Sequence, residues 1–165
     1  MAATRAAMTE KGSEIVDKRV RLTLNEAGQF NATAAPLSAE APPQWKFAIS
    51  PTRIASNDLL NRHKTNWREI YDGEFKRLSA ECDEVIFLNE RDEVVEGSRT
   101  NIFARIGGKL VTPPLSSGAL DGCLRRELIE SGECTERTLT LSDLADADEI
   151  FLGNSLRGLI RANSA

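Results

Sequence analysis

The sequence predicts an α+β protein whose main domain is a mixed-sheet or barrel-like domain. Short apolar runs bounded by Gly, Pro and polar residues recur along the chain, and few stretches carry a helical pattern. The chain has 165 residues, 41% of them hydrophobic and 28% charged, which is ordinary for a globular protein with one real core. We expect a main domain over residues 42–165, preceded over residues 1–41 by a remnant of a small lobe and the start of a linker.

Composition argues against several classes of protein. With 21 Lys+Arg against 25 Asp+Glu, the chain has no basic excess with which to bind nucleic acid. No apolar run approaches the roughly 18 residues of a membrane span, and the N-terminus lacks the apolar core of a signal peptide. Cys82, Cys123 and Cys134 lack CxxC spacing, and His63 is the single histidine. We therefore expect no zinc site or disulfide framework, no metal, and a cytoplasmic location.

The small lobe is predicted to hold one helix and one hairpin. Residues 3–17 are rich in Ala and favour a helix, whereas residues 19–35 alternate apolar and polar side chains about a turn at residues 25–28. Residues 35–43 contain three prolines and little pattern, which is typical of an extended linker.

The main domain is predicted to alternate strands with a few helices. A short strand at residues 45–50 ends before Pro51. A helix follows over residues 65–80, with one face made of Trp67, Ile70, Tyr71, Phe75 and Leu78. Further elements are strands at 84–89 and 102–106, a hairpin through Gly107-Gly108 onto 110–112, a helix from about Gly122 to Ser131, a short helix opening at Ser142 or Asp143, and a last clear strand at 149–153.

Two charged positions stand at element boundaries. Lys64 comes just before the predicted helix, where a desolvated amine could act as a nucleophile or base, although most lone lysines are simply solvated. Glu96 lies between a Val-Val strand and a glycine, where it could pair with a cation or a protonated ring nitrogen, or be an ordinary turn glutamate.

Two small-residue segments complete the set of polar clusters. Residues 116–125 place serines and glycines before a helix N-terminus, which is suited to binding an anion, and residues 153–158 offer similar groups after a strand. Either segment alone could be a plain turn. Together, a lysine, an acid and two anion-binding segments are the parts that a pyridoxal phosphate site requires.

These residues resemble the class IV (fold type IV) pyridoxal phosphate enzymes, across about residues 19–162. The motifs are Glu96-Gly-Ser-Arg-Thr-Asn-Ile-Phe103, Leu110-Val-Thr112 and Leu120-Asp-Gly-Cys-Leu-Arg125, with His63-Lys64-Thr65 and Asn154-Ser155 on either side. Within that family the chain is most similar to the aminodeoxychorismate lyase module fused behind para-aminobenzoate synthase, and the resemblance implies a domain of the D-amino acid aminotransferase-like type.

The resemblance also implies roles for individual residues. Lys64 corresponds to the catalytic Schiff-base lysine and proton shuttle, and Glu96 to the partner of the pyridine nitrogen. The remaining cofactor-binding positions are the backbone amides of Cys123 and Leu124, the hydroxyl of Ser155 with Asn154 beside it, and Arg68, which could instead be a surface arginine. For Cys123 we favour packing over a catalytic thiol, because the sequence shows no partnered base.

The implied reaction converts 4-amino-4-deoxychorismate to 4-aminobenzoate and pyruvate, in folate biosynthesis. Two alternatives stay open: an aminotransferase for branched-chain or D-amino acids, and a truncated domain, weakly active or inactive, that binds the cofactor or serves in assembly. The resemblance implies a homodimer and allows a para-aminobenzoate synthase component as partner. It also implies a fuller small lobe, supplying an arginine to the phosphate, for which no residue of this chain can be assigned.

Overall fold

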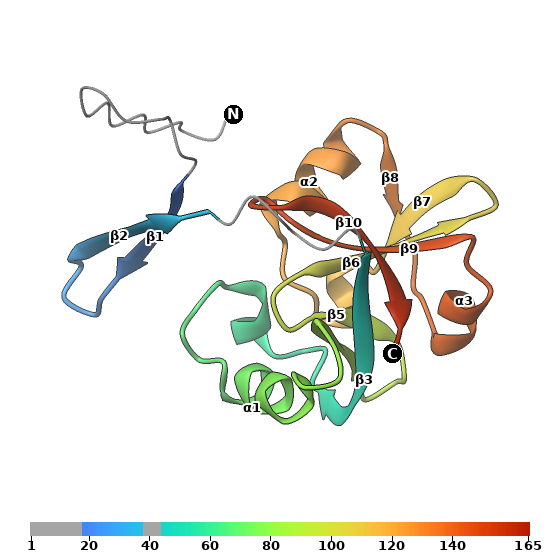
Figure 1. The fold of residues 1–165 in the computed structure, drawn as a ribbon, viewed down its shortest axis with the longest axis horizontal. Coiled ribbons are helices and arrows are strands. Elements are labelled where there is room, and N and C mark those ends of the chain that lie inside the picture. Colours follow the sequence, from blue (N-terminus) through green and yellow to red (C-terminus); the bar gives the residue numbers. More distant parts are fainter. Residues whose placement is uncertain (1–17, 38–43) are drawn as a thin grey trace. The chain divides into compact units, whose positions relative to one another are not determined.

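The computed structural model describes residues 18–37 and 44–165 (Figure 1). The chain divides into two compact units, Met1–Ala41 and Pro42–Ala165. The helix predicted at residues 3–17 lies outside the described residues, as do residues 38–43 of the predicted linker. In the described part of the chain, no helix is both long and apolar enough to cross a membrane.

The first unit contains the predicted hairpin. Strand β1 (Lys18–Leu24) pairs antiparallel with β2 (Phe30–Pro36), and Gly28 takes a positive φ of 75° in the turn. The linker was predicted to begin at Ala35, which is wrong, because Ala35 and Pro36 still pair with β1. The apolar residues of β1 are exposed within this unit.

The second unit is built on one mixed sheet of eight strands, which curls as Figure 1 shows. Its spatial order is β5-β4-β3-β10-β9-β6-β7-β8. Three neighbouring pairs are parallel (β10 with β3, β3 with β4, and β7 with β8) and the others are antiparallel. The strands are β3 (Gln44–Ile54), β4 (Glu84–Asn89), β5 (Val94–Gly97), β6 (Asn101–Ile106), β7 (Lys109–Thr112), β8 (Cys134–Glu136), β9 (Glu149–Asn154) and β10 (Gly158–Ser164).

Helices cover parts of this sheet, and the predicted α+β class is confirmed. They are η1 (Leu59–Arg62), α1 (Glu69–Leu78), η2 (Leu115–Ser117), α2 (Cys123–Glu130) and α3 (Leu141–Ala145). The two-residue period of the strands sorts side chains into separate clusters. In β4, for example, Ile86 and Leu88 join the largest core cluster, whereas Val85 and Phe87 join the cluster that also contains Tyr71 of α1.

The strand predicted at residues 45–50 does not end before Pro51. Strand β3 runs on to Ile54, and its pairing with β4 shifts register between Ile49 and Arg53. Proline has no N–H to donate to a ladder, so strands accommodate it at an irregularity of this kind. Strand β3 therefore ends at Ile54, only a few residues before the η1 segment that precedes Lys64.

The helix predicted over residues 65–80 is shorter than expected. Helix α1 begins at Glu69, because the hydroxyl of Thr65 accepts the N–H of Trp67 (3.2 Å) and holds the preceding backbone in a local turn. The predicted apolar face is correspondingly wrong in part: Trp67 is 75% exposed and Ile70 is 50% exposed. Tyr71 is buried, and two further members, Phe75 and Leu78, pack against its cluster.

The sequence analysis does not predict two of the strands. Strand β10 follows the expected last clear strand at 149–153, and β8 adds three residues at the sheet edge. The hairpin at Gly107-Gly108 and the helix from Gly122 are confirmed. The short helix α3 opens slightly earlier than expected, with Thr140 as its N-cap in a capping box with Asp143.

Candidate active site

A pocket opens between η1, the start of α1 and strand β5. Polar and apolar side chains share its wall, and the lining residues are Leu60, Asn61, His63, Thr65, Trp67, Arg68, Tyr71, Glu96 and Leu120. Two of these, Arg68 and Glu96, were predicted site residues, and two flank Lys64 in the sequence. The pocket wall therefore includes Glu96 and both sequence neighbours of Lys64, but not Lys64 itself.

Glu96 is the buried acid of this pocket. Its side chain lies on β5, the residue is 7% exposed, and its carboxylate accepts the Tyr71 hydroxyl (3.1 Å) and the backbone N–H of Leu120 (3.0 Å). Burial raises the pKa of Glu96 to about 7, although the hydrogen bonds from Leu120 and Tyr71 and the charges of Arg68 and Lys64 oppose the shift. A carboxyl group poised in this way can receive or release a proton near neutral pH.

Tyr71 lines the same pocket, although the sequence predicted it only as part of an apolar helix face. Its hydroxyl donates to Glu96, and its ring packs on Phe87 with centroids 4.7 Å apart. Burial and the neighbouring Glu96 charge both hold the pKa of the Tyr71 hydroxyl above its usual range, so it stays a donor. The sequence did hold one indication of this contact. A tyrosine stands among Phe and Leu on that face, and a buried tyrosine hydroxyl needs a hydrogen-bond partner.

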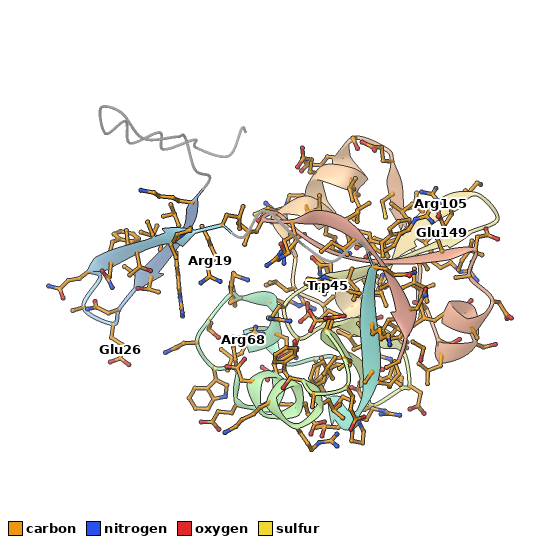
Figure 2. All side chains as sticks on the ribbon, viewed as in Figure 1. Arg19, Glu26, Trp45, Arg68, Arg105 and Glu149 are labelled. Carbon is orange, nitrogen blue, oxygen red and sulfur yellow. The ribbon has the colours of Figure 1, made fainter. Side chains whose placement is uncertain are left out.

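Arg68 supports the pocket from the N-cap of α1 (Figure 2). Its guanidinium lies 4.9 Å from the centroid of the Tyr71 ring, donates to the backbone oxygen of Ser98 and pairs with Asp72 at 3.6 Å. Arg68 therefore lines the pocket, while its donors are directed at protein groups.

Lys64 lies in the segment between η1 and α1, and its side chain is exposed. Its neighbours in sequence, His63 and Thr65, both line the pocket. The positive charge of Lys64 is close enough to lower the pKa of Glu96. The structure thus brings the predicted lysine and the predicted acid into electrostatic contact.

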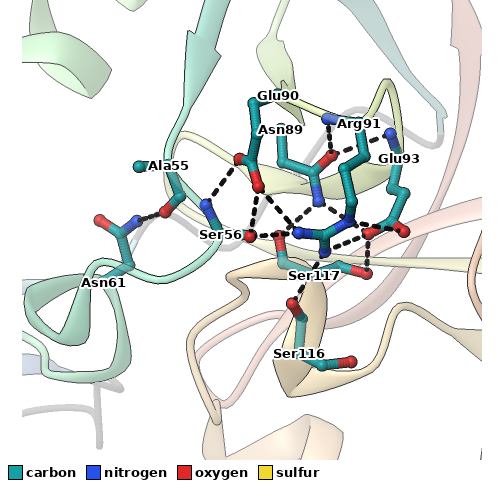
Figure 3. Close-up of polar contacts among 9 residues, drawn as sticks. All are labelled: Ala55, Ser56, Asn61, Asn89, Glu90, Arg91, Glu93, Ser116 and Ser117. Carbon is teal, nitrogen blue, oxygen red and sulfur yellow. Dashed lines mark hydrogen bonds and ion pairs between the residues drawn. The ribbon is translucent and has the colours of Figure 1, made fainter.

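A polar network fixes the start of the Lys64 segment (Figure 3). Glu90 accepts both the N–H (2.9 Å) and the hydroxyl (2.6 Å) of Ser56, and these bonds hold the pKa of Glu90 at about 2. Arg91 reaches the Ser56 hydroxyl, the backbone oxygen of Ser116 (3.1 Å) and Glu93 (2.7 Å). The turn after β4 therefore joins the segment that leads to Lys64 with the segment that leads to Leu120.

A second group of predicted residues lies at the start of α2. Its N-cap is Gly122, which has no side chain to cap the helix, so the backbone amides of Cys123 and Leu124 point out of its first turn. A Cβ at Gly153 would lie 2.8 Å from the Leu124 side chain, so the helix approaches β9 closely there. Cys123 itself is exposed.

Asn154 is the last residue of β9, and Ser155 follows it. The Asn154 side chain accepts the N–H groups of Leu156 and Arg157 (3.1 Å each) and donates to the backbone oxygen of Arg99 (3.3 Å). Ser155 is exposed at the turn that leads into β10. The close contact between Leu124 and Gly153 therefore brings both small-residue segments together.

Asn101, which the sequence reading gave no role, connects the two groups. Its side-chain amide donates to the backbone oxygen of Leu120 (2.9 Å), whose N–H in turn bonds to Glu96. A Cβ at Gly122 would overlap the Asn101 side chain, so only glycine permits this approach. In the sequence, Asn101 is marked only by its place within the motif that runs from Glu96 to Phe103.

The arrangement defines the class of protein. A family model described as amino-transferase class IV matches residues 2–165, and the chain belongs to that family, whose members use pyridoxal phosphate. The curled eight-stranded sheet matches fold type IV structures.

Named relatives fall into two groups. A branched-chain-amino-acid aminotransferase of Thermotoga maritima, assigned provisionally, is 37% identical over 52% of this chain and 33% of its own length. An aminodeoxychorismate lyase of Vibrio harveyi is 30% identical over 69% of this chain and 44% of its own. A crystal structure from Mesorhizobium loti, of a protein assigned provisionally as an amino-acid aminotransferase, is 40% identical with a TM-score of 0.86, covering 90% of this chain and 73% of that one. The chain thus spans less than half the length of these two curated relatives.

The residues present fit pyridoxal phosphate. Among the described residues, the buried Glu96 carboxyl accepts hydrogen bonds only from neutral groups, and a protonated pyridine nitrogen would be a cationic partner for it. At the other end, α2 begins at Gly122 without a side-chain cap, so the backbone amides of its first turn are available to a phosphate group. An amine, Lys64, lies in the segment beside the pocket.

Proposed function

We propose that this chain is a pyridoxal-phosphate-dependent lyase that converts 4-amino-4-deoxychorismate to 4-aminobenzoate and pyruvate in the cytoplasm. One observation carries the cofactor part of the proposal: the buried Glu96 carboxyl lies in the pocket whose wall includes both sequence neighbours of Lys64. A buried acid with a pKa near 7 beside an amine is typical of functional sites.

The predicted residues other than Arg68 would have distinct tasks. The Glu96 carboxylate would hold the ring nitrogen, the amides of Cys123 and Leu124 and the hydroxyl of Ser155 would hold the phosphate, and Asn154 would orient that turn. Lys64 Nζ would attach the cofactor and move the proton of the reacting carbon. When bound, pyridoxal phosphate supplies a ring that withdraws electrons from the bond to be broken.

The positive ring nitrogen changes the state of Glu96. A cation beside a carboxyl group favours its charged form, so cofactor binding should lower the pKa of Glu96 from about 7. Tyr71 and the Leu120 N–H already donate to that carboxylate, and both favour the same charged form. The apo site is therefore arranged for a ligand that carries positive charge at this point.

The extent of the matches supports lyase activity. The lyase of V. harveyi aligns with 69% of this chain, against 52% for the aminotransferase of T. maritima. A second candidate, amino transfer to or from a 2-oxo acid, is favoured by the 40% identity to the M. loti protein. We expect members of this family to act as homodimers and propose the same for this chain.

The first experiment tests cofactor attachment. The full chain is incubated with pyridoxal phosphate, reduced with borohydride and mapped by mass spectrometry. We expect an adduct at Lys64 that is lost in Lys64→Ala and kept in Lys76→Ala, a matched change of an exposed lysine in α1. An adduct spread over surface lysines, or none at Lys64 with near-saturating cofactor, would overturn the proposal.

The second experiment separates the two reactions. The loaded protein is given 4-amino-4-deoxychorismate, and 4-aminobenzoate is measured. In parallel it is given branched-chain and D-amino acids with 2-oxoglutarate, and glutamate is measured. Formation of 4-aminobenzoate without a 2-oxo acid would support the lyase. Glutamate formation alone would support the aminotransferase and overturn the proposed lyase activity.

A further inference from the structure

Glu84 is a buried carboxylate to which the proposed reaction assigns no role. It opens β4 and is 0% exposed. One of its oxygens accepts the Ser98 hydroxyl and the Val85 N–H (3.0 Å). The other accepts the Thr100 hydroxyl (3.0 Å) and the Arg99 N–H (3.1 Å). All of these donors are neutral, and a buried carboxylate without them would be costly.

Three of these donors belong to one turn, residues 97–100, which joins β5 to β6. A Cβ at Gly97 would overlap the Thr100 hydroxyl and lie 3.0 Å from the carboxyl carbon of Glu84. The Gly97 N–H also donates to the Thr100 backbone oxygen (2.7 Å). Glu84 therefore fills the inside of the 97–100 turn, and glycine is required for it to do so.

The 97–100 turn contacts two segments of the candidate site through its backbone oxygens. The oxygen of Ser98 accepts the guanidinium of Arg68, four residues after Lys64. The oxygen of Arg99 accepts the side-chain amide of Asn154 (3.3 Å). A shift of this turn would therefore move both partners.

The residues at either end of the turn hold a third segment. Glu96, just before the turn, accepts the N–H of Leu120, and Asn101, just after it, donates to the oxygen of Leu120. Leu120 comes two residues before Gly122, the N-cap of α2. The separation of Glu96 and Asn101 thus sets where the helix N-terminus lies.

We propose that Glu84 is a positioning residue of this site: its carboxylate fixes the 97–100 turn, and the turn fixes Arg68, Asn154 and Leu120 relative to Glu96. The role at a cofactor rests on the proposed function, but the positioning itself belongs to the chain alone. Rigid support of this kind is what keeps reactive groups within a few tenths of an ångström of a productive geometry.

Glu84→Gln is the sharpest test, because it keeps the volume and removes one acceptor. Whichever carboxylate oxygen becomes an amide, it faces a backbone N–H, of Val85 or of Arg99, that cannot turn round to accept. Ser98→Ala is a milder second variant, since it removes a single donor from Glu84. Leu144→Ala is the matched control: Leu144 is buried in the largest core cluster, on α3.

The readout is hydrogen–deuterium exchange of the full chain without cofactor, at urea concentrations that give all variants the same free energy of unfolding. We expect exchange in residues 97–101 and 118–124 to rise about tenfold or more in Glu84→Gln. Ser98→Ala should show the same pattern with a smaller rise, and Leu144→Ala should leave these peptides unchanged. An unchanged 118–124 peptide in both Glu84→Gln and Ser98→Ala, or an equal rise in Leu144→Ala, would overturn the proposal.

A second arm separates this proposal from the proposed function. If the wild type binds pyridoxal phosphate, Glu84→Gln should weaken its equilibrium affinity about tenfold or more, beyond any change in Leu144→Ala. If the wild type binds no cofactor, the proposed function fails, while the exchange result still decides whether Glu84 positions these segments.

Discussion

The two halves of the candidate site are built differently. The sheet half consists of Glu96, Tyr71 and the Leu120 amide, which are joined by hydrogen bonds at the pocket. The turn half consists of Lys64 and Ser155, which lie in connecting segments with exposed side chains. The sheet half is fixed by folding itself, whereas the turn half keeps rotational freedom, which a lysine that moves a proton needs.

This difference leads to separate expectations for stability and for reaction. A substitution in the turn half removes chemistry without removing packing, so the free energy of unfolding should hardly change. A substitution in the sheet half leaves a buried partner unsatisfied, so stability and chemistry should change together.

Lys64→Ala should reduce 4-aminobenzoate formation by about 10²–10⁴-fold, the usual contribution of a positioned proton-transfer group. Because the Lys64 side chain is exposed, the free energy of unfolding of the Lys64→Ala protein should stay within about 0.5 kcal/mol of wild type. Steady-state rates and urea unfolding measure the two quantities. Lys76→Ala, in α1, should change neither, and a large loss of stability in Lys64→Ala would show that the turn half is structural after all.

The pH dependence of stability should report the buried Glu96. Its pKa is raised from an ordinary 4.5 to about 7, so the folded protein binds more protons than the unfolded chain between these values. The stability contributed by this group is fully present below pH 4.5 and is lost as pH rises through 7. The loss should be on the order of 3 kcal/mol in cofactor-free protein.

Urea unfolding at pH 4.5, 6 and 8 measures this slope, and Glu96→Gln should flatten it. Glu130→Gln, on the exposed side of α2, is the matched control and should keep the wild-type slope. Glu90 and Glu93, whose pKa values are lowered from 4.5 to about 2, change stability mainly between those two values, and what they add at pH 4.5 is the same in wild type and Glu96→Gln. An equal slope in wild type and Glu96→Gln would mean that Glu96 is not a buried titrating acid.

The sequence predicted the fold class and named candidate site residues, but it missed the contacts between them. Glu96, Lys64 and the α2 N-terminus could be named as candidates because each lies in a local motif at an element boundary. The partners of Glu96 could not, because Tyr71 reaches it only once α1 packs over the sheet, 25 residues away in sequence. Local patterns carry no information on such contacts.

The errors in secondary structure also have tertiary causes. Pro51 looked like a strand end, yet β3 absorbs it in a register shift against β4. Strand β10 buries Ile160 and Ala162 in alternation, but Arg161 and the flanking polar residues weaken that pattern in a short segment. Its neighbours β3 and β9 supply the ladder partners that define it as a strand.

Ser155→Ala tests the turn half at its other end. One hydrogen bond to a charged group contributes about 1.5–3 kcal/mol, so loss of the hydroxyl should weaken pyridoxal phosphate affinity about tenfold or somewhat more. Because Ser155 is exposed, the free energy of unfolding of the Ser155→Ala protein should not differ measurably from wild type. Equilibrium titration of the cofactor absorbance measures the affinity. Ser142→Ala, at an exposed serine of α3, should leave it unchanged, and an equal effect there would argue against a phosphate site at Ser155.

Tyr71→Phe should give the smallest effect, because it removes one hydroxyl and keeps the ring against Phe87. The lost hydrogen bond should cost about 1 kcal/mol of stability above pH 7, where Glu96 is charged. The Tyr71 bond favours the charged form of Glu96, so its removal should raise the pKa of Glu96 above 7 and extend the stability slope to higher pH.

Carbon-13 NMR of the Glu96 carboxyl follows this titration directly. Phe75→Leu is the control, since Phe75 lies on the same helix and packs against the same cluster without a hydrogen bond to Glu96. It should lower stability and leave the Glu96 midpoint near 7. If the midpoint stays near 7 in Tyr71→Phe, the Tyr71 hydroxyl does not set the pKa of Glu96. The groups that lower this pKa would then be the Leu120 amide, Arg68 and Lys64. The sheet half would then depend on the backbone of the 120 segment, and not on α1, for the state of its acid.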